Sequence, residues 1–368
     1  MNTKQRESII GTNDDAASCK LSAVNLGYYK DDYVKYFVKK AIKRPPLINR
    51  GFFTRIQCIE DLILQFLNTY PQSEAKQIIS LGCGFDTYYF REHKNLSKYK
   101  ITYIEVDYDQ VVRNKIKIIQ QHHTELQKQQ HQTQDRDGSG SGSGSGGASS
   151  PLAGIDFSDA AVLQHQLEHL EIKCADYRLG SIDLTNMDTF SIFDADHLNV
   201  DFSVPTLFLS ECVLVYIPPQ CGNNVIQWAS THFKESCFIT YEQIKPNDEF
   251  GSMMIKNIEM KGCPLLSIQS FPEIKDQKKR YLDLGWNRVE ALDLKQVHSY
   301  FINRDRVREI ERLEIFDEFE EWDLIQSHYC FVLAIKSASQ TIIDSYHFEQ
   351  CLLNKPAPTP ATSMKFFS

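Results

Sequence analysis

Two glycines separated by one residue follow a short apolar run within residues 78–87 (IISLGCGFDT). Glycine lacks a Cβ, so Gly82 lets the chain turn tightly and Gly84 lets the backbone approach a ligand closely. Asp86 and Thr87 are good first residues for a following helix. This pattern is typical of a strand-to-helix turn at a nucleotide site. Position 87 is Thr where the dinucleotide fingerprint has its third glycine, so an ordinary tight turn stays open as an alternative from this motif alone.

Three acidic residues stand where later apolar runs end, and these are Asp107, Asp183 and Glu211. In a chain that alternates strands and helices, such ends meet at one edge of a parallel sheet, where ligands bind. Asp107 lies 25 residues beyond Gly82, close to the spacing of roughly 20 residues at which an acid binds a ribose diol. One acid at a strand end is more often a helix cap. Their order along successive strands favours a ligand site.

The segments that would position these residues alternate between two periodicities. Strands are expected at residues 77–81, 101–106, 177–182, 206–210, 237–241, 285–292 and 328–336. Helices are expected at residues 16–40, 53–67, 87–93, 158–170, 218–233, 251–261 and 305–322, with another after the second strand. The sequence therefore predicts an α/β fold with a doubly wound, mainly parallel seven-stranded sheet. Irregular segments before the first strand and after the fifth would form a helical lid.

One domain is expected over residues 1–337, interrupted by a flexible low-complexity insert at about 121–155. The insert contains the alternating Gly-Ser run 138–147, which cannot build a core. Strand and helix signals resume after it, so it interrupts a domain rather than separating two. Residues 338–368 are rich in Ser, Thr and Pro and are expected to be a loosely held tail.

Composition narrows the class of protein. The 368 residues carry a formal net charge of −8, which argues against a general nucleic-acid binder. No apolar stretch is long enough for a membrane span, and the first twenty residues lack a signal-peptide core. Ten cysteines without a CxxC pair favour reduced thiols over disulfides. We therefore expect a monomer in the cytoplasm or nucleus that binds neither membrane nor nucleic acid.

Residues 165–169 (HQLEH) match the HxxEH pattern of a zinc-protease family. They stand beside the low-complexity insert, and no distal glutamate ligand is identifiable. A solvated helix face is the better interpretation. No metal site is therefore expected.

Seven segments together resemble the leucine carboxyl methyltransferases, which are class I methyltransferases dependent on S-adenosylmethionine. The matching segments are residues 18–24 (SCKLSAV), 46–55 (PLINRGFFTR), 81–87 (LGCGFDT), 105–107 (EVD), 211–216 (ECVLVY), 246–251 (PNDEFG) and 328–330 (HYC). The resemblance extends over about residues 14–336 apart from the insert. It implies a class I methyltransferase fold.

The resemblance also implies a set of cofactor contacts. The residues that would bind S-adenosylmethionine are Lys20, Arg55, Gly82, Gly84, Asp107, Asp183, Leu184 and Glu211. Asp107 would bind the ribose hydroxyls, while Asp183 and Leu184 would hold the adenine. The family's methyl acceptor is the C-terminal leucine carboxylate of the type 2A protein phosphatase catalytic subunit, which would be the partner of this chain.

Lys20, Arg55 and Tyr216 would form the catalytic group, with the two cations near carboxylates and Tyr216 facing the reacting group. A terminal carboxyl has a pKa of roughly 3.3–3.7, so it is a nucleophile at neutral pH without a general base. Alignment and exclusion of water are then the main requirements.

Two alternatives remain at this point. A related branch methylates a wybutosine-type base in transfer RNA and carries a kelch-repeat propeller, whose period of roughly 50 residues is not visible here. The other is a non-catalytic phosphatase-binding protein that has lost its cofactor.

Overall fold

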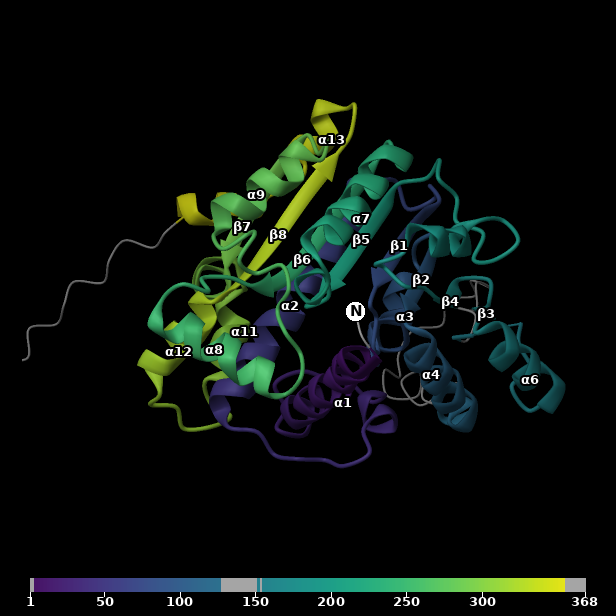
Figure 1. The fold of residues 1–368 in the computed structure, drawn as a ribbon, viewed down its shortest axis with the longest axis horizontal. Helices are drawn as coiled ribbons and strands as arrows, with labels where there is room; N and C mark the ends of the chain where they lie inside the picture. Colours follow the sequence, from purple (N-terminus) through teal and green to yellow (C-terminus); the bar gives the residue numbers. More distant parts are fainter. Residues whose placement is uncertain (1–2, 127–150, 153, 355–368) are drawn as a thin grey trace, which may run out of the picture.

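The structure is a computed structural model that describes residues 3–126, 151–152 and 154–354 (Figure 1). Most of the insert expected at 121–155, including its Gly-Ser run, lies outside the described residues. The end of the expected tail, residues 355–368, also lies outside them.

A single sheet of eight strands forms the centre of the described chain. In sequence order the strands are β1 (Lys76–Leu81), β2 (Ile101–Asp107), β3 (Ile172–Lys173), β4 (Tyr177–Ser181), β5 (Thr206–Glu211), β6 (Ser236–Gln243), β7 (Arg288–Asp293) and β8 (Tyr329–Lys336). Their spatial order is β3-β4-β2-β1-β5-β6-β8-β7. Strands β4, β2, β1, β5 and β6 are parallel, and β8 runs against both its neighbours. This confirms the class I methyltransferase fold, with the two-residue strand β3 added to the seven expected strands.

The register of the central strands explains why distant acids meet. Leu81, the last residue of β1, is in register with Val106 of β2 and Ser210 of β5. The residues after these three positions therefore emerge side by side at one edge of the sheet, and they include Asp107 and Glu211. Nearly every residue of β1, β5 and β6 is buried, because helices cover both faces of the sheet.

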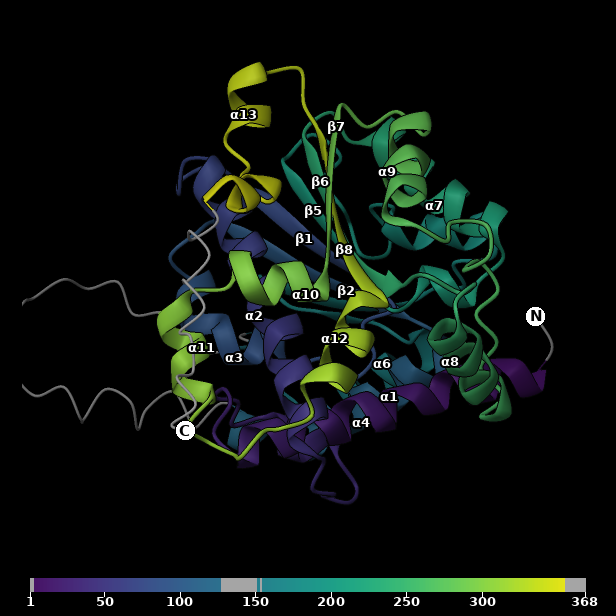
Figure 2. The same cartoon turned by 90° about the vertical axis from the view of Figure 1, so that its left-hand side faces the viewer.

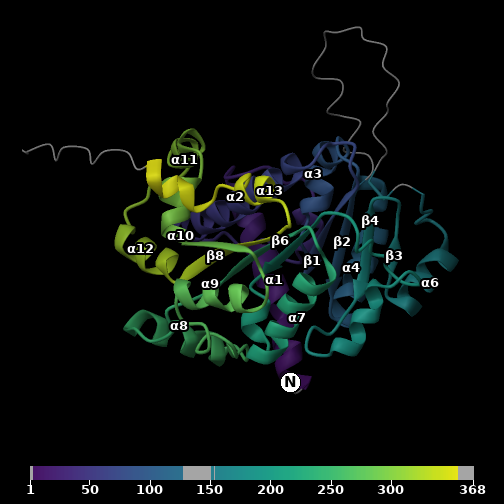
Figure 3. The same cartoon turned by 90° about the horizontal axis from the view of Figure 1, so that it is seen from above.

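Helices cover the sheet in two layers (Figures 2 and 3). One layer contains α2 (Pro46–Thr69), α3 (Tyr88–Leu96), α4 (Asp109–Gln121) and α10 (Leu294–Gln296). The opposite layer contains α7 (Pro219–His232) and α9 (Ile274–Asp283). Helix α6 (Ala160–His169) lies beyond the β3–β4 edge, and α11 (Arg304–Ile310) and α13 (Gln340–Asp344) complete the α2 side. Each layer buries its own apolar cluster against the sheet.

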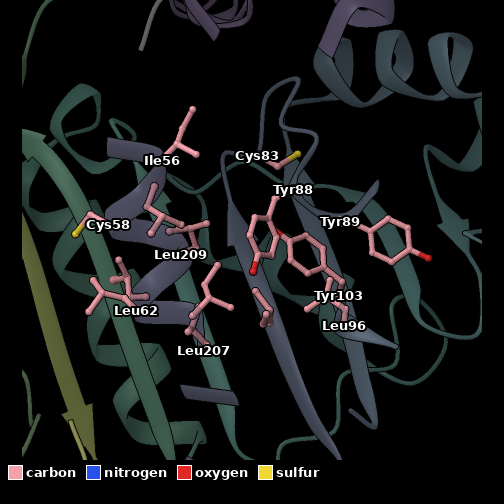
Figure 4. Close-up of a cluster of buried hydrophobic side chains, with 14 of the residues drawn as sticks. Ile56, Cys58, Leu62, Cys83, Tyr88, Tyr89, Leu96, Tyr103, Leu207 and Leu209 are labelled. Carbon is pink, nitrogen blue, oxygen red and sulfur yellow. The ribbon is translucent and has the colours of Figure 1, made fainter. Parts of the chain in front are cut away.

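The α2 layer shows how the core fixes the functional end of the sheet (Figure 4). Helix α2 starts with Pro46 in its first turn, a position where the missing N–H has no cost. Its apolar face places Ile56 and Leu62 over Leu209 and the neighbouring part of β5. Fully burying each such side chain stabilises the fold by about 1.5–3 kcal/mol. The helix that carries Arg55 is therefore firmly attached to the sheet.

Three helices lie across the end of the sheet where the parallel strands finish, at the lower edge of Figure 1. They are α1 (Thr3–Asn25), α8 (Glu249–Met260) and α12 (Phe319–Ser327). In the described part of the chain no helix has both the length and the hydropathy needed to cross a membrane. His165 and His169 lie exposed on α6, and among the described residues no three potential metal ligands cluster.

Helix α2 begins at Pro46, seven residues before the expected start at 53, and two other expected helices are also wrong in their bounds. The first was expected at residues 16–40, but α1 ends at Asn25 and the chain turns through Gly27, whose φ is +85°. The acidic helix expected at 305–322 is broken into α11 and α12. Glu314 lies in the chain between these two helices. It accepts hydrogen bonds of 3.0 Å from Tyr28 and 3.1 Å from Asn49. These contacts hold the chain around Glu314 against α2. A continuous helix over residues 305–322 could not keep them.

The segment after Ser337 is more ordered than the expected loose tail. Helix α13 is followed by Tyr346 and Phe348, which are fully buried. The ring of Phe348 packs edge-on against Phe301 with centroids 4.9 Å apart, and its N–H donates to Glu290 at 2.8 Å. Residues 340–354 therefore belong to the folded structure.

Candidate active site

The carboxyl ends of β1, β2 and β5 open into a cavity of about 350 Å³. This lies at the lower end of the roughly 300–1,000 Å³ typical of small-molecule sites. Helices α1 and α2 and the end of α8 cover it, and its lining includes Asn13, Arg55, Gly82, Asp107, Leu184, Glu211 and Tyr216. A side chamber that shares Gly82 and Arg55 with this cavity also contains Lys20 and Gly84. The structure thus brings eight of the nine expected site residues to these two adjoining spaces.

The two glycines have the conformations that their sequence pattern predicts. Gly82 and Gly84 have φ values of +62° and +53°, in the left-handed region that favours glycine. The N–H of Gly82 donates to Val106 at 2.8 Å, which keeps the turn against β2. A Cβ on Gly84 would lie 2.5 Å from Oδ1 of Asn13 on α1. The turn therefore needs glycine for its backbone angle and for the close approach of α1.

We expect Gly84→Ala to destabilise the protein by at least about 1–2 kcal/mol, the cost of a left-handed L-residue, before the clash with Asn13 is counted. Gly11→Ala is the matched control, because nothing lies within 4 Å of the added Cβ in α1. That control should be neutral or stabilise by up to about 1 kcal/mol. Denaturant unfolding measures both, and equal midpoints for the two variants would contradict the expectation.

Asp107 ends β2 as a buried carboxylate. Its Oδ2 accepts the N–H of Gly84 at 2.7 Å, and its Oδ1 accepts the N–H of Tyr108 at 2.7 Å. Burial raises the pKa of Asp107 to about 6, although these two N–H groups oppose the shift. The side chain is consequently ionised at neutral pH, with lone pairs left to accept hydroxyl groups from a ligand in the cavity.

Arg55 and Glu211 form a buried ion pair beside the glycine turn. Nε of Arg55 donates to Oε2 of Glu211 at 2.5 Å, and its Nη2 contacts the same oxygen. The guanidinium lies 4.7 Å from the ring centroid of Tyr241. Burial alone would lower the pKa of Arg55, but the charge of Glu211 outweighs it and raises that pKa. Arg55 is therefore a permanent cation that faces the cavity.

Lys20 lies between Glu211 and a second carboxylate, that of Asp86. Its Nζ donates to Oδ1 of Asp86 at 2.7 Å and lies 3.8 Å from Glu211. Burial disfavours its charged form, yet the two carboxylates raise the pKa of Lys20. Burial alone would raise the pKa of Asp86, but Lys20 lowers it well below its usual range. Asp86, Lys20, Glu211 and Arg55 therefore form a row of alternating charges with no net charge.

The remaining expected residues lie on the other walls. Tyr216 belongs to the 3₁₀ turn η3 (Leu214–Tyr216), is 8% exposed and lines the cavity. Leu184 is buried and also lines it. Asp183 lies beside the cavity rather than among its lining residues, and its carboxylate accepts the N–H and hydroxyl of Thr185. A contact between Asp183 and adenine stays a prediction.

Several site residues were not found from the sequence. Asp86 was interpreted only as a helix cap, although it also binds Lys20. Asn13 lies in a polar stretch of α1 without local signal. Tyr241 and Gln243 line the cavity from the end of β6. Their place at the end of the fifth expected strand was the available signal for these two.

Comparison with known proteins identifies the family. The sequence profile described as leucine carboxyl methyltransferase matches residues 8–230. The "Leucine carboxyl methyltransferase 1 homolog" of Arabidopsis thaliana is 38% identical over 337 residues, covering 90% of each chain. "Leucine carboxyl methyltransferase 1" of Bos taurus is 32% identical, covering 91% of each. "tRNA wybutosine-synthesizing protein 4" of Rattus norvegicus is also 32% identical, but the match covers 45% of that protein. The chain is therefore a methyltransferase and belongs to the leucine carboxyl methyltransferase family.

Proposed function

We propose that this methyltransferase uses S-adenosylmethionine to esterify the C-terminal leucine carboxylate of a type 2A protein phosphatase catalytic subunit. The observation that carries the proposal is the neutral row of Asp86, Lys20, Glu211 and Arg55 beside a cavity edged by Asp107. Matches to two proteins named leucine carboxyl methyltransferase over about nine-tenths of each chain support it.

The residues fit the cofactor in three respects. Its amino-acid part is a zwitterion, so its carboxylate can pair with Lys20 or Arg55 while its ammonium pairs with Asp86 or Glu211. Asp107 has free acceptor capacity for two ribose hydroxyls. The open left-handed glycine turn allows close backbone approach. When bound, S-adenosylmethionine supplies an electrophilic methyl group on a sulfonium.

The charged row also suits a carboxylate as the methyl acceptor. An acceptor that pairs strongly with a cation is stabilised in the ground state, which slows a reaction that removes charge. Arg55 is already paired with Glu211 at 2.5 Å, so it can orient an acceptor carboxylate without fully neutralising it. Burial raises the pKa of Tyr216, which keeps its hydroxyl protonated and able to donate a hydrogen bond. These residues orient the acceptor, and the buried walls exclude water.

The test is transfer of a labelled methyl group to purified phosphatase catalytic subunit. We expect base-labile labelling that disappears when the terminal leucine of the phosphatase is deleted. Unchanged labelling of the truncated phosphatase would exclude the proposed acceptor, and labelling of transfer RNA instead would favour the wybutosine branch. Calorimetry with S-adenosylmethionine separates these outcomes from a non-catalytic binding protein, which would show no heat of binding.

A further inference from the structure

Glu242 is a carboxylate in β6 that faces away from the cavity. Successive side chains of a strand point to opposite faces, and its neighbours Tyr241 and Gln243 both line the cavity. Glu242 is 1% exposed and shares its face of β6 with Phe238, which packs in the apolar cluster of α7 and α9. It takes no part in the proposed binding of cofactor or acceptor, so its burial needs another reason.

The carboxylate holds the turn that carries Tyr216. It accepts the N–H of Val215, the middle residue of η3, at 2.7 Å. Ser267 secures the same turn from the other side, where its hydroxyl donates to Leu214 at 3.0 Å and its N–H donates to Val215 at 3.1 Å. The position of Tyr216 is thus fixed through backbone contacts of the two residues before it.

The surroundings of Glu242 disfavour its charge. Burial raises its pKa to about 7, opposed by the Arg280 guanidinium and by the N–H groups of Val215 and Leu214. The other titratable groups that interact with it are Tyr281 on α9, Cys212 after β5 and Cys330 on β8. The neutral form is therefore favoured in the folded protein relative to an exposed glutamate. Because burial disfavours the ionised form, a gain in folding stability does not explain why a glutamate occupies this position.

We propose that Glu242 is a positioning residue for methyl transfer, whose carboxylate fixes η3 so that Tyr216 faces the acceptor. This inference rests on the proposed function for its catalytic readout. A hydrogen bond to an ionised acceptor is roughly twice as strong as one to a neutral acceptor. Protonation of Glu242 therefore loosens the turn, and kcat falls as the pH is lowered through about 7.

The test compares Glu242→Gln and Glu242→Leu with the wild-type protein. Glutamine keeps an acceptor oxygen and mimics the protonated acid, so we expect kcat at pH 8 to fall about tenfold and to lose its inflection near pH 7. Leucine removes the acceptor and should lower kcat further. Affinity for S-adenosylmethionine, measured by calorimetry, should change less than about threefold in the glutamine variant, because Glu242 does not contact the cavity.

Stability separates positioning from a merely structural role. A pKa raised above the unfolded value means that stability is greatest at low pH and is lost as the pH rises through about 7. Glu242→Gln should consequently unfold at a temperature no lower than the wild type at pH 8 while being less active. Glu290→Gln is the matched control. It is also a buried carboxylate that accepts backbone N–H groups, but it lies on the outer strand β7, where its loss should lower stability and leave the pH profile of kcat unchanged.

Hydrogen exchange provides a readout that needs no acceptor. The amide of Val215 should be protected at pH 8 and lose at least about tenfold of that protection, relative to intrinsic rates, below pH 6. It should show no such pH dependence in Glu242→Gln. A glutamine variant with the wild-type pH dependence of both exchange and kcat would overturn the inference. Failure of the wild type to methylate the phosphatase would affect the proposed function alone, because the exchange result does not depend on it.

Discussion

Arg55→Ala is expected to reduce methyl transfer at least about thirtyfold while the protein stays folded. The substitution removes the guanidinium that pairs with Glu211 and faces the cavity. Truncating one member of a buried charge pair typically costs about 2–5 kcal/mol in the complex, or roughly 30-fold to several thousandfold. Glu211 keeps Lys20 at 3.8 Å, so its charge is not left without a neighbour. Single-turnover transfer and circular dichroism measure the two parts of this result.

Two other variants sharpen the test of Arg55. Arg308→Ala removes an arginine whose ion pair with Asp305 is exposed to solvent on α11, and it should change turnover less than about twofold. Arg55→Lys keeps the charge but loses the planar fork, so we expect activity between those of wild type and the alanine variant. Wild-type turnover in Arg55→Ala would remove this residue from the site.

Asp107→Asn is expected to weaken cofactor binding at least about tenfold, because hydrogen bonds to a charged acceptor contribute about 1.5–3 kcal/mol. Wild-type affinity should also depend on pH. Burial raises the pKa of Asp107 to about 6, and in the proposed binding mode the ribose hydroxyls contact its ionised form. The dissociation constant should therefore be flat above about pH 7 and rise up to tenfold for each pH unit below 6. Calorimetry with S-adenosylhomocysteine from pH 5 to 8 measures this slope.

The asparagine variant should have lost the pH slope as well as the affinity. Asp109→Asn is the matched control, since Asp109 is an exposed acid two residues further on that binds Ser181 outside the cavity. Its affinity and slope should equal those of the wild type. A slope that persists in Asp107→Asn would assign the titration to another group and contradict the role of Asp107.

The sequence alone was enough to predict which residues lie at the carboxyl ends of the parallel strands. Strand periodicity and the glycine pattern placed Gly82, Asp107 and Glu211 at successive strand ends, and neighbouring strands in register brought these ends together. Lys20 and Tyr216 came from the resemblance to a family, because nothing in their local sequence indicates a site. Strand ends can be predicted because a parallel sheet aligns them whatever the helices do.

Only the tertiary structure decided which charges pair and which elements close the site. Lys20 binds Asp86, 66 residues away, because α1 crosses the end of the sheet. The same crossing places Asn13 over Gly84. An expected helix is interrupted at Glu314, because Tyr28 and Asn49 from the N-terminal part of the chain donate hydrogen bonds to it. Contacts of this kind depend on how separate elements pack, and the packing energy is shared among many buried side chains far apart in the sequence. Local spacing therefore predicts the sheet edge, while the partners across the cavity follow only from the assembled fold.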